Sequence, residues 1–145
     1  MKKLFLDTEF NGFMGKLMSM ALVPENLDDE YFYVELEIKD QIDPWVQENV
    51  VPHMFLPAVS YNEFQNKLAN YLYDIGPCTI VADWPDDIRH FSESLITGPG
   101  MSIRLMHDIH FELDMNINYT SEVPHNALHD AIGIREAYLG KKQAS

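Results

Sequence analysis

The sequence predicts one mixed α/β domain, and three local patterns carry that prediction. Residues 32–38 alternate apolar and polar side chains, which is the period of a strand with one buried face. Ser60 and Glu63 have the spacing of a capping box, and apolar residues at helical spacing follow them to about Asp74. The apolar run 78–82 comes next and is typical of a fully buried strand.

Strands are expected first along the chain. The predicted ranges are 4–10, 16–23 and 31–38, and a turn-like segment at 24–29 separates the second strand from the third. The first of these strands is a short apolar stretch that nevertheless contains two acidic residues.

Helices are expected in much of the remainder. Asp43 is a suitable N-cap and Pro44 a suitable first helical residue, so a short helix is predicted there. Another helix is expected after Pro85, and a last one over residues 125–139. Gly140 and the two lysines after it are typical of a helix end, because basic side chains suit the negative end of the helix dipole.

Composition narrows the class of protein. The 145 residues are 46% hydrophobic and 23% charged, which predicts one globular domain over residues 1–145. A net charge of −13 excludes the common basic nucleic-acid binder and disfavours anionic membranes, but it allows a nuclease whose acids hold metal ions. The apolar start ends at Asp7, too early for a signal peptide, and no segment has the ~18 apolar residues of a membrane span. The single Cys78 fits a reducing compartment, so a cytoplasmic protein without membrane contact is expected.

The first predicted strand contains an unusual pair of acids. Asp7 and Glu9 are two residues apart, so their carboxylates point to one face of the strand, roughly 6.5–7 Å apart along the backbone. Two neighbouring acids on an otherwise apolar strand repel each other and lose hydration, and a bound cation offsets both costs. The alternative is an ordinary solvated strand face.

Asp130 lies within the apolar stripe predicted for the last helix. A carboxylate there needs a partner, because an unpaired buried charge is costly. The alternatives are an ion pair with Arg135 or a place at the margin of the stripe. The expected stripe consists of Ala127, Ile134, Ala137 and Tyr138.

A third group of acids follows the buried strand 78–82. Asp83, Asp86 and Asp87 come directly after its end, where α/β folds usually place ligand sites. Asp83 or Asp86 could equally be a helix N-cap.

Taken in order, these motifs resemble the DEDDh 3′–5′ exonucleases of the ribonuclease H-like superfamily. The matching segments are Asp7-Thr8-Glu9-Phe10, the acids after the mid-chain strand, and the run from His125 to Ala131. A small bacterial and phage exoribonuclease-like group shares them, together with a stretch like Trp45-Val46 through Pro52. The resemblance spans almost the whole chain. It implies a ribonuclease H-like mixed β-sheet flanked by helices.

The resemblance also implies roles for single residues. Asp7, Glu9 and Asp130 match metal ligands, and His125 matches the general base. The middle motif has an Asn followed four residues later by a ligand Asp. Here Asp83 stands at the Asn position, where it would contact substrate.

Asp87 is four residues beyond Asp83 and is therefore the expected fourth ligand, with Asp86 as the alternative register. Two Mg²⁺ or Mn²⁺ ions at such a site activate a water and stabilise the leaving 3′ oxygen. These hard ions prefer carboxylate oxygens. A histidine titrates near neutral pH and suits removal of the proton from the attacking water.

The expected substrate is the 3′ end of single-stranded RNA, with single-stranded DNA as the alternative, and the product is a nucleoside monophosphate. RNA and a homodimeric state are implied by the resemblance alone. Phe10 and Phe13 could stack on the terminal base, although Phe10 could equally be a core aromatic. Because two Mg²⁺ leave the protein strongly negative, few phosphate contacts and a small salt dependence are expected.

Other chemistries fit less well. His125 and His129 have the spacing of two zinc ligands on a helix, but Asn126 stands where a metalloprotease has glutamate. The His129-Asp130 dipeptide occurs in all-helical phosphohydrolases, which would leave the first strand unexplained. The segment 107–110 has two histidines that could bind a metal, but an exposed strand segment is the preferred interpretation. A catalytically idle ribonuclease H-like module that binds protein or nucleic acid remains the alternative outside the enzymes.

Overall fold

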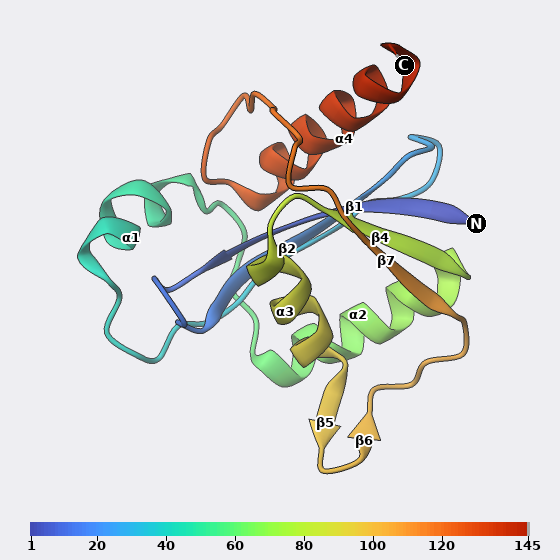
Figure 1. The fold of residues 1–145 in the computed structure, drawn as a ribbon. Coiled ribbons are helices and arrows are strands. Elements are labelled where there is room, and N and C mark those ends of the chain that lie inside the picture. The colour runs from blue at the N-terminus through green and yellow to red at the C-terminus, as the bar shows by residue number, and fades with distance from the viewer. Residues whose placement is uncertain (145) are drawn as a thin grey trace.

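A computed structural model describes residues 1–144, and it shows a mixed α/β fold (Figure 1). Five strands form one mixed sheet in the order β3-β2-β1-β4-β7. Strands β1 and β2 are antiparallel, as are β2 and β3, whereas β4 is parallel to both β1 and β7. The strands of this sheet are β1 (Lys2–Phe10), β2 (Leu17–Pro24), β3 (Phe32–Glu35), β4 (Cys78–Ala82) and β7 (Ile109–Leu113).

Helices cover both faces of the sheet (Figure 1). Helix α4 (Ala127–Ala144) lies on one face, and α2 (Tyr61–Ile75) and α3 (Pro85–Ser94) lie on the other. The short helix α1 (Pro44–Asn49) and the 3-10 turn η1 (Val51–His53) lie to one side of the sheet. A small hairpin, β5 (Ile96–Gly98) with β6 (Met101–Ser102), projects below α3. The prediction of a mixed sheet flanked by helices is confirmed.

Strand β1 is central and divides its side chains between the two layers. Leu4 and Leu6 pack in the core formed with α2 and α3, whereas Phe5 packs against Ile134 and Tyr138 of α4. This alternation is the period of a strand buried on both faces. Later side chains of β1 keep the same alternation, so odd-numbered residues face the α4 layer.

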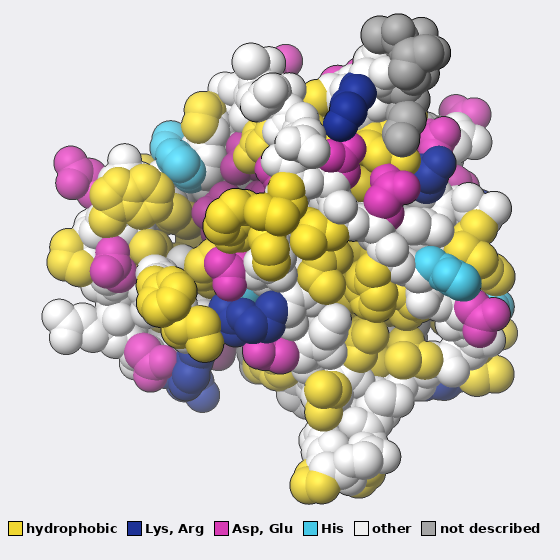
Figure 2. Space-filling model, viewed as in Figure 1, with side chains coloured by type: hydrophobic (Ala, Val, Ile, Leu, Met, Phe, Trp, Pro, Cys, Tyr) yellow, Lys and Arg dark blue, Asp and Glu magenta, His cyan; other side chains and the backbone are white. Residues whose placement is uncertain are grey.

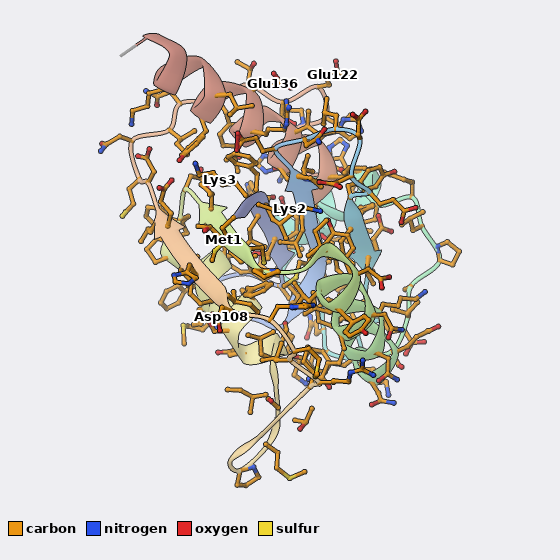
Figure 3. All side chains as sticks on the ribbon, turned by 90° about the vertical axis from the view of Figure 1, so that its right-hand side faces the viewer. Met1, Lys2, Lys3, Asp108, Glu122 and Glu136 are labelled. Atoms are coloured by element: carbon orange, nitrogen blue, oxygen red, sulfur yellow. The ribbon has the colours of Figure 1, made fainter. Side chains whose placement is uncertain are left out.

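The strand ends have a common polarity. Figure 3 looks at the side of the sheet where β1 begins, and its labels place Lys2 and Lys3 there, with Asp108 just before β7. Because β1, β4 and β7 are parallel, their carboxyl ends all point away from this side. That far edge is where the acids of β1 and of the segment after β4 meet.

Local signals placed several elements correctly. The side chain of Asp43 caps α1, accepting from the amides of Trp45 (3.0 Å) and Val46 (3.3 Å). Ser60 caps α2 by accepting from the amide of Glu63 (3.1 Å). Each cap satisfies backbone donors that the first helical turn leaves free.

Two expectations about element boundaries are wrong. The third strand ends at Glu35, and this glutamate is buried although it lies on the polar side of the alternation. It accepts hydrogen bonds from the backbone amides of Phe55 (3.0 Å) and Leu56 (2.8 Å) and from the hydroxyl of Tyr33. These three donors compensate the loss of hydration and attach the segment after η1 to the sheet.

The last helix also differs from its predicted range. It begins at Ala127, where the side chain of Asn126 caps it by accepting from the amide of His129 (3.1 Å). It continues through Gly140, which does not adopt the left-handed conformation of a helix end. Lys141 in the following turn pairs with Asp114 (3.1 Å), and this contact favours continuation.

Residues 97–123, over which no helix or strand pattern extends, contain most of the small hairpin and the edge strand β7. Of the predicted strand segment 107–110, Ile109 and His110 begin β7, whereas His107 and Asp108 come before it. Within residues 1–144, no helix combines the length and the apolar character that crossing a membrane requires.

Candidate metal centre

Five acidic side chains from four elements converge at the carboxyl ends of β1 and β4. Two come from β1, one follows β4, one lies in the first turn of α3 and one in the first turn of α4. The exposed fraction is 6% for Asp7, 4% for Asp87 and 5% for Asp130. Carboxylates this deeply buried need compensation by protons, hydrogen bonds or cations. The five residues are Asp7, Glu9, Asp83, Asp87 and Asp130.

The five acids form two groups that share Asp7. In one group, carboxylate oxygens of Asp7, Asp83 and Asp87 lie within 4.8 Å of one another. In the other, oxygens of Asp7, Glu9 and Asp130 do so. Two neighbouring sets of carboxylate oxygens with one common residue match the ligand type that Mg²⁺ and Mn²⁺ prefer.

Proton affinities reflect this crowding. Burial, followed by the charges of Asp87 and Glu9, raises the pKa of Asp7 well above its usual range. Burial and then Asp130 raise the pKa of Glu9 to about 9. Burial also raises the pKa of Asp87 to about 7, although hydrogen bonds from Thr8 oppose that change. Without cations, protons must therefore neutralise part of the cluster.

A divalent cation fits this site better than protons alone do. The Oδ2 atom of Asp7 is buried and has no hydrogen-bond partner among residues 1–144. An unpartnered carboxylate oxygen on the residue shared by both groups is what a cation would satisfy. The donor set therefore fits hard divalent ions.

Thr8 fixes the orientation of Asp87. Its amide (3.2 Å) and its hydroxyl (2.5 Å) both donate to Oδ1 of Asp87. Asp86 points elsewhere, because its carboxylate accepts from the indole of Trp84 (3.0 Å) and from Arg89 (3.5 Å). The structure thus brings Asp87, and not Asp86, to the other acids.

The ordinary structural alternatives for these acids do not hold. Helix α3 begins without a side-chain cap, so neither Asp83 nor Asp86 caps it. Arg135 donates to the backbone oxygens of Pro24 and Glu25 and pairs with Glu136, so it is not the partner of Asp130.

His125 lies on the loop just before α4, beside Asp130. Its side chain is exposed, and its charge contributes to lowering the pKa of Asp130 against the larger effect of burial. The ring packs edge-on against Trp45 of α1, with 5.1 Å between centroids. His125 has a φ of 69°, the left-handed region that costs a non-glycine residue about 1–2 kcal/mol.

Asn126 holds this loop in place. It is 2% exposed, and its Nδ2 donates to the hydroxyl of Tyr33 (3.1 Å) and to the backbone oxygen of His53 (2.9 Å). The amide also caps α4, so β3, the segment after α1 and the start of α4 meet at one side chain. His125 is therefore attached to a fixed residue while its own ring stays accessible.

The two candidate aromatic residues have different surroundings. Phe10 is half-buried, and its ring lies 4.7 Å from the ring of His90. Phe13 is 91% exposed, next to Gly12, whose φ of 76° turns the chain after β1. Phe13 is thus open to a ligand, and base stacking by either ring stays a prediction.

Tyr119 is a neighbour of the acids that the sequence did not reveal. Burial raises the pKa of its hydroxyl, and the charges of Asp7 and Asp130 raise it further. Gly133 of α4 allows this approach, since a Cβ there would lie 2.3 Å from the backbone oxygen of Thr120 and 2.9 Å from the Tyr119 ring. In the sequence, a glycine inside a helical pattern, here Gly133, was the only indication that another segment comes close to this helix.

Histidine-based metal sites find no support among the described residues. The groups of possible ligands that lie close enough together contain carboxylates alone. His107 contacts the backbone oxygen of Tyr73 (3.1 Å), and His110 is exposed on β7.

The raised pKa values predict how pH changes stability. In the metal-free protein the Glu9 proton stabilises the fold, because the pKa rises from 4.5 to about 9 on folding. That stabilisation is complete below the lower value and is lost as the pH rises through the higher one. We expect the Tm of the metal-free protein to fall as the pH rises from about 6 to 9. Over the same range the rise in Tm caused by Mg²⁺ should become larger, because bound cations displace protons.

Thermal denaturation with Mg²⁺ or EDTA across this pH range tests the expectation. Glu9→Gln should flatten the metal-free profile, because its amide does not titrate. A Mg²⁺-induced change in Tm that is equal at every pH would contradict it.

Comparison with known proteins adds nothing to the geometry of this site. No family model matches this chain, and no curated protein matches it.

Proposed function

We propose that this chain is a metal-dependent 3′–5′ exonuclease that acts on RNA and releases nucleoside monophosphates. The observation that carries the proposal is the pair of carboxylate groups sharing Asp7. Phosphodiester hydrolysis requires charge stabilisation on both the attacking and the leaving oxygen, and adjoining cation sites supply it.

The fold and the motif order support the same class. A five-stranded mixed sheet with helices on both faces is compatible with the ribonuclease H-like fold. The motifs that resemble the DEDDh exonucleases supply the acids from β1, the α3 start and α4, and these side chains lie together. The preference for RNA and a homodimeric state follow from that resemblance.

The carboxylates would divide the binding of cations between them. Asp7 would contribute to both sites, with Asp87 and Asp83 on one side and Glu9 and Asp130 on the other. Bound divalent ions would supply Lewis-acid activation of water and stabilise the leaving 3′ oxygen. Thr8 keeps Asp87 oriented for this task through its two hydrogen bonds.

His125 is the proposed general base. Its ring is exposed beside Asp130, so it can accept a proton from a water that attacks the terminal phosphorus. As the new P–O bond forms, the bond between phosphorus and the 3′ oxygen of the preceding nucleotide breaks. The departing 3′ oxygen takes a proton from solvent, so the products are a nucleoside 5′-monophosphate and a strand with a free 3′ hydroxyl.

Digestion of end-labelled oligonucleotides tests the proposal. Single-stranded RNA and DNA of one sequence, labelled at the 5′ end, are incubated with Mg²⁺, Mn²⁺ or EDTA. We expect a metal-dependent ladder that shortens from the 3′ end, with RNA digested faster. Absence of shortening for both strands, in a folded protein, would overturn the proposal and favour an idle binding module.

A further inference from the structure

A concave site separate from the acid cluster lies between the β1–β2 loop, the segment after β3, the start of α2, and α3. It is a cavity of about 590 Å³. That volume falls within the range of small-molecule sites, which are mostly apolar with a few polar groups. Leu17, Leu36, Ile38 and the ring of Tyr61 supply its apolar wall. A wall of aliphatic side chains and one aromatic ring suits the flat face of a nucleobase.

Cations gather at this cavity. Lys16, Lys39 and Arg89 line it, and they are three of the ten Lys and Arg residues in a strongly acidic chain. Figure 2 shows basic side chains in the region of α3 and, apart from these, at the lower left of the molecule, with acidic and apolar side chains beside them. Among the described side chains no acid forms an ion pair with Lys39, and its exposed ammonium is free to bind an anion.

Arg89 is held in place beside this cavity. Its terminal nitrogens contact Glu93 (3.2 Å), Asp86 (3.5 Å) and Nε2 of His90 (3.2 Å). These contacts fix the guanidinium, while its Nε is buried without a hydrogen-bond partner in the described structure.

Acidic side chains offset most of this positive charge. Glu37 and Glu93 also line the cavity, Lys16 pairs with Asp40 at 3.1 Å, and Arg89 pairs with Asp86 and Glu93. Lys39 is the cavity cation that has no acidic partner among the described residues, and one such cation suits a singly charged phosphodiester better than a polyphosphate.

The cavity lies beside the end of β1, on the opposite face of that strand from Glu9. His90 lines the cavity, and its ring lies 4.7 Å from that of Phe10, whose side chain points to the layer of α2 and α3. His90 is three residues after Asp87 on α3, so the two side chains lie about one helical turn apart. A strand whose last linkage lies at the acids would have its nearby nucleotides within reach of the cavity.

We infer that this cavity is a nucleotide-binding subsite for the strand upstream of the linkage that is cleaved. The base lies on the apolar wall, and Lys39 and Lys16 contact its phosphodiester. The inference rests on the proposed function, because it takes the acid cluster as the place of cleavage. It gives an acidic protein a local means of holding a polyanion.

A binding measurement with the nuclease blocked tests this inference. Asp7→Asn protein is titrated with fluorescent single-stranded RNA hexanucleotides and dinucleotides at several salt concentrations. Lys39→Gln and Lys16→Gln are added to this background, and Lys67→Gln is the matched control, since Lys67 is exposed on α2 and does not line the cavity.

We expect each cavity substitution to raise the hexanucleotide Kd about fivefold and to lower the salt slope by about 0.7, the value of one phosphate contact on a single strand. Dinucleotide binding and the Lys67→Gln control should not change. The subsite would be overturned if the cavity variants lost equal affinity for the hexanucleotide and the dinucleotide. It would also be overturned if their affinities equalled that of the Lys67→Gln control. The subsite would also be overturned if the cavity variants bound a free nucleoside monophosphate more weakly and lost the same affinity for strands of every length. The cavity would then hold a free nucleotide.

The two proposals fail separately. If the unsubstituted protein digests no strand while hexanucleotide binding still depends on Lys39, the enzyme assignment falls and the cavity stands only as a strand-binding site. If digestion occurs and the lysines have no effect on binding, the subsite alone is wrong.

Discussion

Replacing Asp7 by Asn is expected to lower metal-dependent hydrolysis by about 10³-fold or more. Asp7 is the residue common to both carboxylate groups, so its loss weakens both cation sites. The same substitution should raise the Tm of the metal-free protein, because it removes a buried carboxyl whose pKa burial and neighbouring acids have raised. A gain of about 1–2 kcal/mol would correspond to a rise of about 4 °C.

Digestion rates and thermal denaturation of the same preparations measure both effects. Asp108→Asn is the matched control, since Asp108 is exposed at the opposite end of the sheet (Figure 3). It should leave the rate and the Mg²⁺-induced rise in Tm unchanged. Asp7→Asn protein that retains wild-type activity would rule out the proposed division of ligands.

Replacing His125 by Ala is expected to lower kcat by about 10²–10⁴-fold, the usual contribution of a general base. The cation sites should survive, because His125 is not among the grouped ligands. The Mg²⁺-induced rise in Tm should therefore equal that of the wild type. Single-turnover digestion together with thermal denaturation separates loss of the base from loss of the metal.

His110→Ala is the control for that substitution, since His110 is an exposed histidine on the edge strand β7. It should digest RNA at the wild-type rate. If His125→Ala instead lost both activity and stabilisation by Mg²⁺, the histidine would be part of the metal centre and not the base.

Local sequence signals were sufficient for much of this fold. The strand at Cys78–Ala82 has its predicted bounds, and the helix caps at Asp43 and Ser60 make the expected hydrogen bonds. Each of these depends on a few consecutive residues. Asp7 and Asp130 were identifiable because an acid within an apolar pattern is visible without knowing its partner.

Features that depend on distant residues were not predictable in this way. Glu35 is buried because amides 20 and 21 residues later bind its carboxylate, and its local pattern places it on the polar face. Tyr119 reaches the acids because Gly133, 14 residues later, leaves room for its ring and for the backbone of Thr120. The continuation of α4 past Gly140 accompanies a contact between Lys141 and Asp114. Such pairings arise from tertiary packing, which overrides local propensity.

Counting bound Mn²⁺ tests the central claim most directly, because it needs neither substrate nor activity. Free Mn²⁺ is followed by electron paramagnetic resonance while the protein is titrated near pH 8. Two ions per chain are predicted for the wild type, and Asp7→Asn should reduce both sites. A wild-type chain that binds no Mn²⁺ at this pH would contradict the account.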